Sequence, residues 1–294
     1  MSRSSVSRKL TEAKRRGIVK ISFTSGYTGD HALGRKLQRM FALKDLVLVP
    51  DIAAGSEIRL KERLGAAAAS YISETIRPGH KVGISWGTTL FEVALRLRPQ
   101  RVLGVCVVQL NGCVGQGAAS YLGAQVLQMI ATKLGAQAFS FPAPAIVRDP
   151  ALSEALRKEP SIAGALEVAL GCDIAVFTVG VVDPACVLVR AGYLTPADMN
   201  DLRTRGAVGD ICSRFFDSRG QVCNPDLDRR TLGLSLRDLV TIPLKIMVAG
   251  GTHKVAGILG ALRAGYADVL ITDETSAHAV MDLAAHQMCS ARQA

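Results

Sequence analysis

The sequence predicts an α/β domain built on a Rossmann-like, mainly parallel β-sheet with helices on both faces. Short apolar runs rich in β-branched residues recur along the chain and alternate with segments of helical pattern. Within these runs apolar residues follow one another instead of alternating with polar residues, which indicates strands buried on both faces. The strand-like runs span residues 45–50, 81–86, 101–110, 174–182, 244–251 and 268–273, and the helix-like segments span 58–72, 89–97, 118–135, 196–206 and 254–265.

Composition supports a globular protein with a sizeable core. The chain has 294 residues, of which 49% are hydrophobic and 20% charged, and this usage excludes disorder and low complexity. No apolar run approaches the roughly 18 residues of a membrane-spanning helix, so we expect a cytoplasmic protein with no membrane partner. The seven cysteines are scattered, with no C-x-x-C pair, which favours reduced core thiols over disulfides or a metal site.

The positive charge is concentrated at the start of the chain. Of a net charge of +10, residues 1–20 contribute seven Lys and Arg against one Glu. The segment 2–16 has a helical pattern, with Val6, Leu10 and Ala13 on one stripe and Gly17 where a helix would end. Its polar faces carry short hydroxyls and long cations suited to phosphates and base edges of DNA, namely Arg3, Ser4, Ser5, Ser7, Arg8 and Lys9. Charge alone fits a solvated basic tail equally well.

Two strand-to-helix junctions share a layout that suits a phosphate. In the first, Gly87 permits close backbone approach, and Thr88 and Thr89 place hydroxyls and free amides at a helix N-terminus. In the second, at residues 249–254, Lys254 is predicted in the first turn of a helix, where the helix dipole disfavours a cation unless it faces an anion. Either junction alone is also compatible with a simple turn and cap. Neither matches G-x-G-x-x-G or the Walker pattern, so a dinucleotide or ATP cofactor is disfavoured.

Other polar residues follow predicted strands or turns. Asp210 lies within the run 206–217, before an apolar strand, where a half-buried carboxylate needs a partner such as a sugar hydroxyl. A turn aspartate that bonds its own backbone is an equally good interpretation. Asn111, Gly112 and Arg190 are weaker candidates, because loops after strands carry such residues routinely. The proline-rich stretch 141–160 is expected to form a loop or lid over the same edge of the sheet.

Several segments resemble one family. SRSSVSRKLTEAKRRGIVKI resembles the recognition helix and exit strand of the SorC family of bacterial sugar-sensing transcription regulators. The segments VGISWGTTL, LNGCVG, FPAPAIV, GAVGDICSRFFD, AGGTHKVAGILGAL and LITDETSA occur in the order and approximate spacing of the SorC-type effector domain, which is similar in fold to sugar-phosphate isomerases and deaminases. The resemblance implies that residues 1–22 are a partial helix-turn-helix segment with a remnant recognition helix. Residues 23–294 would then form the effector-binding and oligomerisation domain.

The resemblance also implies a set of effector contacts. Gly87, Thr88 and Thr89 would hold the phosphate of a phosphorylated sugar, and Lys254 would pair with its charge. Asp210 would accept hydrogen bonds from sugar hydroxyls, the loop at Asn111 and Gly112 would line the pocket, and Arg190 would add a second cation. Asn111 and Cys113 depart from the glycine-rich sequence most common in the family at this loop, which leaves the shape of the sugar-binding end of the pocket open.

The function expected from these observations is regulation of carbohydrate catabolism by a DNA-binding dimer or tetramer that senses a phosphorylated sugar or polyol. No cofactor is expected. The alternative is a sugar-phosphate isomerase or deaminase, because one fold can host both classes. Such an enzyme needs a general base and a ring-opening acid, for which Asp210 and His253 are the available candidates. A ligand-binding protein without a DNA role is a third alternative.

Overall fold

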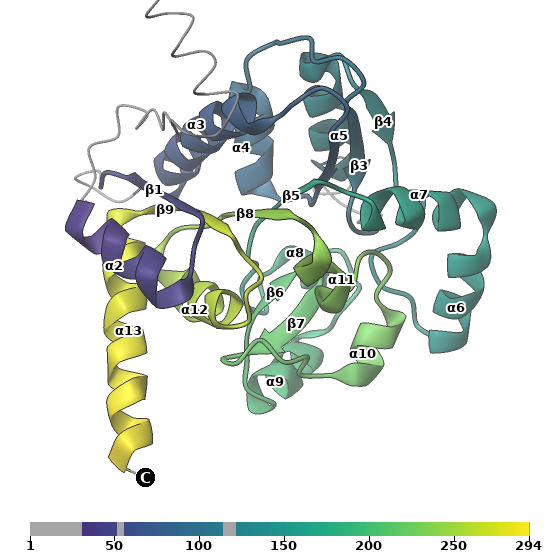
Figure 1. Ribbon diagram of the computed structural model, residues 1–294. Coiled ribbons are helices and arrows are strands. Elements are labelled where there is room, and N and C mark those ends of the chain that lie inside the picture. Colours follow the sequence, from purple (N-terminus) through teal and green to yellow (C-terminus); the bar gives the residue numbers. More distant parts are fainter. Residues whose placement is uncertain (1–30, 52–55, 114–121, 294) are drawn as a thin grey trace, which may run out of the picture.

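The computed structural model describes residues 31–51, 56–113 and 122–293 of the protein (Figure 1). Its centre is a seven-stranded sheet in the order β1-β9-β8-β5-β2-β3-β4, and every neighbouring pair of strands is parallel. This confirms the α/β prediction. The strands are β1 (Asp45–Val49), β2 (Lys81–Ile84), β3 (Cys106–Gln109), β4 (Gln137–Phe139), β5 (Ile174–Phe177), β8 (Leu244–Val248) and β9 (Val269–Asp273). The predicted recognition helix and its six DNA contacts lie outside the described residues.

Helices cover both faces of the sheet, as the sequence predicts. One core cluster joins one face to α3, α4 and α5, and another joins the opposite face mainly to α2, α11, α12 and α13. Strand residues alternate between the two cores because successive side chains point to opposite faces. The helices are α2 (His31–Phe41), α3 (Glu57–Thr75), α4 (Thr88–Arg96), α5 (Leu122–Leu134), α6 (Pro150–Lys158), α7 (Pro160–Leu170), α8 (Val187–Arg190), α9 (Pro196–Thr204), α10 (Pro225–Arg230), α11 (Leu236–Thr241), α12 (Val255–Arg263) and α13 (Glu274–Gln293).

A small antiparallel hairpin lies beyond the sheet. It consists of β6 (Ala207–Ile211) and β7 (Arg214–Asp217), and it packs with α8, α9 and α10 around a separate apolar cluster. Gly180, just after β5, forms a bridge with Asp210 of β6, with the Gly180 N–H donating to the Asp210 carbonyl over 2.8 Å. This bridge fixes the hairpin against the carboxyl edge of the sheet.

The expectation of a loop or lid over residues 141–160 is wrong for its second half. Residues 150–158 form α6, and α7 begins at Pro160. Asp149 caps α6 by accepting the Ala151 N–H over 2.8 Å, and a proline occupies the first turn of each helix. Proline is favoured there, since its missing N–H has no intrahelical partner to lose. Within the described residues, no helix is long and apolar enough to cross a membrane.

Helices α3 and α4 lie side by side and run in the same direction. At Gly65 of α3, a Cβ would come within 2.6 Å of the backbone carbonyl carbon of Glu92 on α4. Further along, the Gln100 side-chain amide donates to the Ser73 carbonyl over 3.3 Å. Gln100 lies beyond the end of α4, and the shared direction of the helices follows from the sheet: α3 follows β1 and α4 follows β2, and both begin at the carboxyl edge of parallel strands.

Gly65→Ala is therefore expected to destabilise the protein by about 1–3 kcal/mol, because the added methyl group would force α3 away from the α4 backbone. The measurement is the urea midpoint of unfolding. Gly164→Ala is the matched control. Gly164 lies inside α7 and a Cβ there meets nothing within 4 Å, so alanine should stabilise by roughly 0.4–1 kcal/mol. Equal midpoints for the two variants would contradict this close packing.

Candidate functional site

The carboxyl ends of β5, β2 and β3 carry buried polar atoms that lack partners. Ser85 follows β2, Asn111 follows β3 and Thr178 follows β5, and these three strands are neighbours. Among the described residues, Ser85 Oγ, Asn111 Oδ1 and Thr178 Oγ1 have no hydrogen-bond partner. Buried polar groups are normally satisfied, so their grouping at one edge suggests a polar ligand. The order of strands reverses here, where α/β folds place ligands.

The first predicted junction has the geometry expected of an anion site. Gly87 precedes α4 with φ +150°, and a Cβ there would lie 3.4 Å from the Thr178 methyl carbon. No side chain caps α4, so the first-turn amides are available to an anion. Thr88 is exposed and Thr89 is buried. The helix therefore presents an open N-terminus beside the end of β5.

The second predicted junction differs in one detail from expectation. Lys254 is not in the first turn of α12 but ends a short 3₁₀ turn, η1 (Thr252–Lys254), that precedes α12. The Gly251 N–H donates to Asp273 Oδ1 over 2.9 Å and to Ser276 Oγ over 2.7 Å. At Gly250 a Cβ would lie 2.2 Å from the same Asp273 oxygen, so only glycine fits. These contacts fix the turn that carries Lys254.

Asp210 and Lys254 influence each other. Burial raises the pKa of the Asp210 carboxyl to about 6, and the Ser213 N–H bond and the Lys254 charge oppose that rise. Burial and the nearby Lys61 charge lower the pKa of Lys254 to about 8, and the Asp210 charge opposes that fall. The Asp210 carboxylate also accepts the Ser213 N–H over 3.1 Å, as the turn interpretation requires. The predicted acid and the predicted lysine therefore lie within electrostatic reach of each other, without an ion pair between these two described residues.

The exit of β5 connects the two junctions. Thr178 lies against Gly87, and the next residue, Val179, packs on Gly209 of β6 and Gly257 of α12. A Cβ at Gly257 would lie 2.7 Å from Val179 Cγ1. Because Gly257 is one turn beyond Lys254, the α4 N-terminus and Lys254 flank the same short segment of backbone.

The other three predicted contacts, Gly112, Asn111 and Arg190, show no described contact with Asp210 or Lys254. Gly112 packs against the backbone of Pro144. Its N–H donates to the Leu232 carbonyl, and its carbonyl accepts the Trp86 indole N–H. The backbone of Asn111 forms a bridge with Gly233, but its side-chain oxygen is free of described partners. Arg190 is exposed at the end of α8, and no described contact links it to Asp210 or Lys254.

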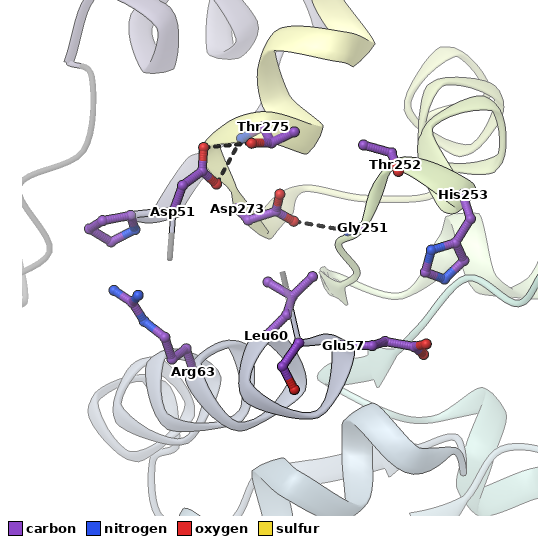
Figure 2. A pocket seen from close by; sticks show the side chains of 11 residues that line it. Asp51, Glu57, Leu60, Arg63, Gly251, Thr252, His253, Asp273 and Thr275 are labelled. Atoms are coloured by element: carbon purple, nitrogen blue, oxygen red, sulfur yellow. Dashed lines mark hydrogen bonds between the residues drawn. The ribbon is translucent and has the colours of Figure 1, made fainter. Parts of the chain in front are cut away.

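A cavity of about 270 Å³ lies beside this region, between the start of α3 and the ends of β1, β8 and β9 (Figure 2). Its lining residues are Pro50, Asp51, Ser56, Glu57, Leu60, Arg63, Gly251, Thr252, His253, Asp273 and Thr275. None of the eight predicted effector contacts lines it. Asp51 accepts the Thr275 N–H over 3.1 Å and the Thr275 hydroxyl over 2.5 Å, which joins β1 to the start of α13. The cavity shares the Gly251–His253 turn with the predicted site, and this turn leads directly into Lys254.

Sequence reasoning missed three side chains near the predicted site: Lys61, Ser85 and Thr178. Burial of the two hydroxyls could not be inferred from sequence. Lys61 forms an ion pair with Glu57 one turn away, a spacing that usually marks a solvated helix face. Among the described residues, no group of three or more His, Cys, Asp or Glu is arranged to hold a metal ion.

Comparison with known proteins identifies the family. The family model described as "Putative sugar-binding domain" matches residues 25–282. The deoxyribonucleoside regulator of Bacillus subtilis is 35% identical over 286 residues, covering 96% of this chain and 90% of that protein.

Solved structures agree. The full-length sorbitol operon regulator SorC from Klebsiella pneumoniae has a TM-score of 0.78 at 25% identity, covering 95% of this chain and 89% of that one. A DeoR family transcriptional regulator from Listeria monocytogenes also has a TM-score of 0.78, at 28% identity, covering 85% of this chain and 98% of that one. The segments shared with SorC-type regulators, the parallel sheet and these matches lead to one conclusion: the chain belongs to the SorC-type family of sugar-binding transcription regulators.

Proposed function

We propose that the protein senses a phosphorylated sugar or polyol at the carboxyl edge of its sheet and regulates carbohydrate catabolism in response. The observation that supports this most is that Asp210 and Lys254 lie within electrostatic reach of each other, close to the uncapped N-terminus of α4. A sugar phosphate offers an anion for one end of this arrangement and hydroxyl donors for the other. The contacts we assign are Gly87, Thr88, Thr89, Asn111, Gly112, Arg190, Asp210 and Lys254.

Each assigned group has a separate physical role. The amides and hydroxyls of Thr88 and Thr89 donate to phosphate oxygens, and Lys254 supplies the balancing charge. Asp210 accepts hydrogen bonds from hydroxyls of the sugar. A bound phosphate would also favour the protonated form of Lys254, whose charge is costly without an anion because the side chain is partly buried.

Regulation requires a second binding site, which we propose binds DNA. Relatives of this chain are named as transcriptional regulators. Residues 1–22 carry the proposed DNA contacts Arg3, Ser4, Ser5, Ser7, Arg8 and Lys9. We propose that a cytoplasmic dimer or tetramer binds a pseudo-symmetric operator. The effector then shifts the equilibrium between two arrangements of the protomers by its differential affinity for them.

We further propose that the effector is bound without being converted. The Asp210 pKa of about 6 is in the range of a general base, which is the one feature that favours an isomerase or deaminase. The named relatives give that alternative no support.

A ligand screen tests the proposal. Pentose, hexose and polyol phosphates are added to the purified protein, and the melting temperature is followed by differential scanning fluorimetry. At least one phosphorylated compound should raise the melting temperature, because a ligand that binds only the native state stabilises it by mass action. Its unphosphorylated parent is the control and should not. Chromatography of the ligand after incubation should return it unchanged, and a product absent from Asp210→Ala would instead establish the enzyme.

A further inference from the structure

Lys61 is a cation close to the proposed effector site and is not among the contacts proposed above. It lies in the first turns of α3 and forms an ion pair with Glu57 over 2.6 Å. The Lys61 side chain is 24% exposed, whereas that of Glu57 is 58% exposed. Figure 2 shows Glu57 pointing to the side of the cavity where His253 lies. The pair therefore lies at the end of α3 nearest the η1 turn.

Packing of α3 places Lys61 between the two proposed phosphate-binding junctions. Leu64 rests on the second junction, since its Cδ1 would lie 2.9 Å from a Cβ at Gly250. Gly65 rests on α4 at Glu92, one turn beyond Thr88. Because α3 and α4 run in the same direction and touch at Gly65 and Glu92, the residue one turn before Gly65 lies towards the Thr88 end of α4. That residue is Lys61.

Electrostatics agree with this placement. After burial, the charge of Lys61 is the largest contribution that lowers the pKa of Lys254. The opposing negative charges that reach Lys254 belong to Asp210 and Glu57. The same cluster lowers the pKa of Glu57, chiefly through its bond to Lys61. Two ammonium groups in such proximity are stabilised when a shared anion balances both.

We propose that Lys61 is a further cation of the effector site beside Lys254. Its ammonium group leaves Glu57 and pairs with the phosphate held by Lys254 and the N-terminus of α4. The inference rests on the proposed function and narrows its ligand class to compounds with a dianionic phosphate. Glu57 competes with that phosphate for Lys61. The competition is weak because Glu57 is largely exposed, so solvent screens the ion pair, and the flexible lysine side chain can reorient.

Isothermal titration calorimetry with inorganic phosphate tests the proposal, using the full chain. Lys61→Gln should weaken phosphate binding about tenfold, the loss expected for one charge-assisted hydrogen bond. Lys61→Arg, which keeps the charge, should retain most of the affinity. Glu57→Gln should bind phosphate more tightly than the wild type because it frees Lys61. The control is Arg59→Gln, which removes an exposed cation from the same helix and should bind as the wild type does.

Two results would overturn the role of Lys61 without affecting the proposed function. The first is wild-type phosphate affinity in Lys61→Gln. The second is equal weakening in Lys61→Gln and Glu57→Gln, which would mean that the ion pair only stabilises α3. Both presuppose that the wild type binds phosphate and that Lys254→Ala does not. If the wild type binds neither phosphate nor any sugar phosphate, the proposed function fails, and the role of Lys61 fails with it. The melting temperatures of the ligand-free variants distinguish lost binding from lost folding.

Discussion

Lys254→Ala should abolish the rise in melting temperature that a phosphorylated effector produces, with a loss of affinity of at least about a hundredfold. A hydrogen bond to a charged group contributes about 1.5–3 kcal/mol, and removing the lysine also leaves the ligand phosphate without its nearest assigned cation. Thr88→Val removes a hydroxyl but keeps the backbone amide, so it should weaken binding less. Calorimetry with the effector found by the screen gives both affinities. Lys158→Ala, at the end of α6, is the matched lysine control and should bind normally.

The pH dependence of binding provides a second readout. Since the pKa of Lys254 is about 8, the free protein loses this charge as the pH rises above that value. Effector affinity should therefore fall above about pH 8 in the wild type, whereas in Lys254→Arg it should not, because arginine stays protonated. Wild-type affinity in Lys254→Ala would remove the phosphate assignment.

The strands could be predicted because their physical signal is local. Six of the seven strands of the sheet fall within the predicted apolar runs, since strands buried on both faces are apolar at most positions. The run 101–110 contains β3 only from Cys106 onward. β4 was missed because it has three residues, none of them fully buried. α6 and α7 were missed because proline was interpreted as a break and not as a helix start.

The site was harder to predict, because its key properties are not local. The proximity of Asp210 to Lys254 depends on a hairpin that docks through Gly180, and no pattern in sequence indicates that docking. The Glu57 and Lys61 pair has the spacing of an ordinary surface pair, and only the packing of Gly65 on Glu92 reveals what lies beside it. The roles of Asn111, Gly112 and Arg190 stay predictions.

Arg214→Met should destabilise the protein by about 3–5 kcal/mol, the cost of breaking a buried ion pair by removing one partner. The Arg214 side chain is 2% exposed and pairs with Asp228 over 2.5 Å. Its guanidinium also donates to the carbonyls of Asp228, Thr231, Gly233 and Leu234 at 2.8–3.2 Å. Methionine can fill most of the volume but leaves the Gly233 and Leu234 carbonyls without their guanidinium donor, whereas Arg157 still donates to the Thr231 carbonyl and the Thr231 N–H to the Asp228 carbonyl. The change should appear as a lower midpoint of urea unfolding.

Arg214→Met should also weaken effector binding. The carbonyls that Arg214 holds belong to the segment in which Gly233 bridges Asn111 and the Leu234 N–H donates to the Leu110 carbonyl over 2.8 Å. Loss of Arg214 loosens this segment, so effector affinity should fall together with stability. Arg229→Met is the matched control: Arg229 is 67% exposed and pairs with an exposed Asp226, so its loss should cost less than about 1 kcal/mol. Equal unfolding midpoints for the two variants would show that Arg214 does not organise the segment that positions Asn111.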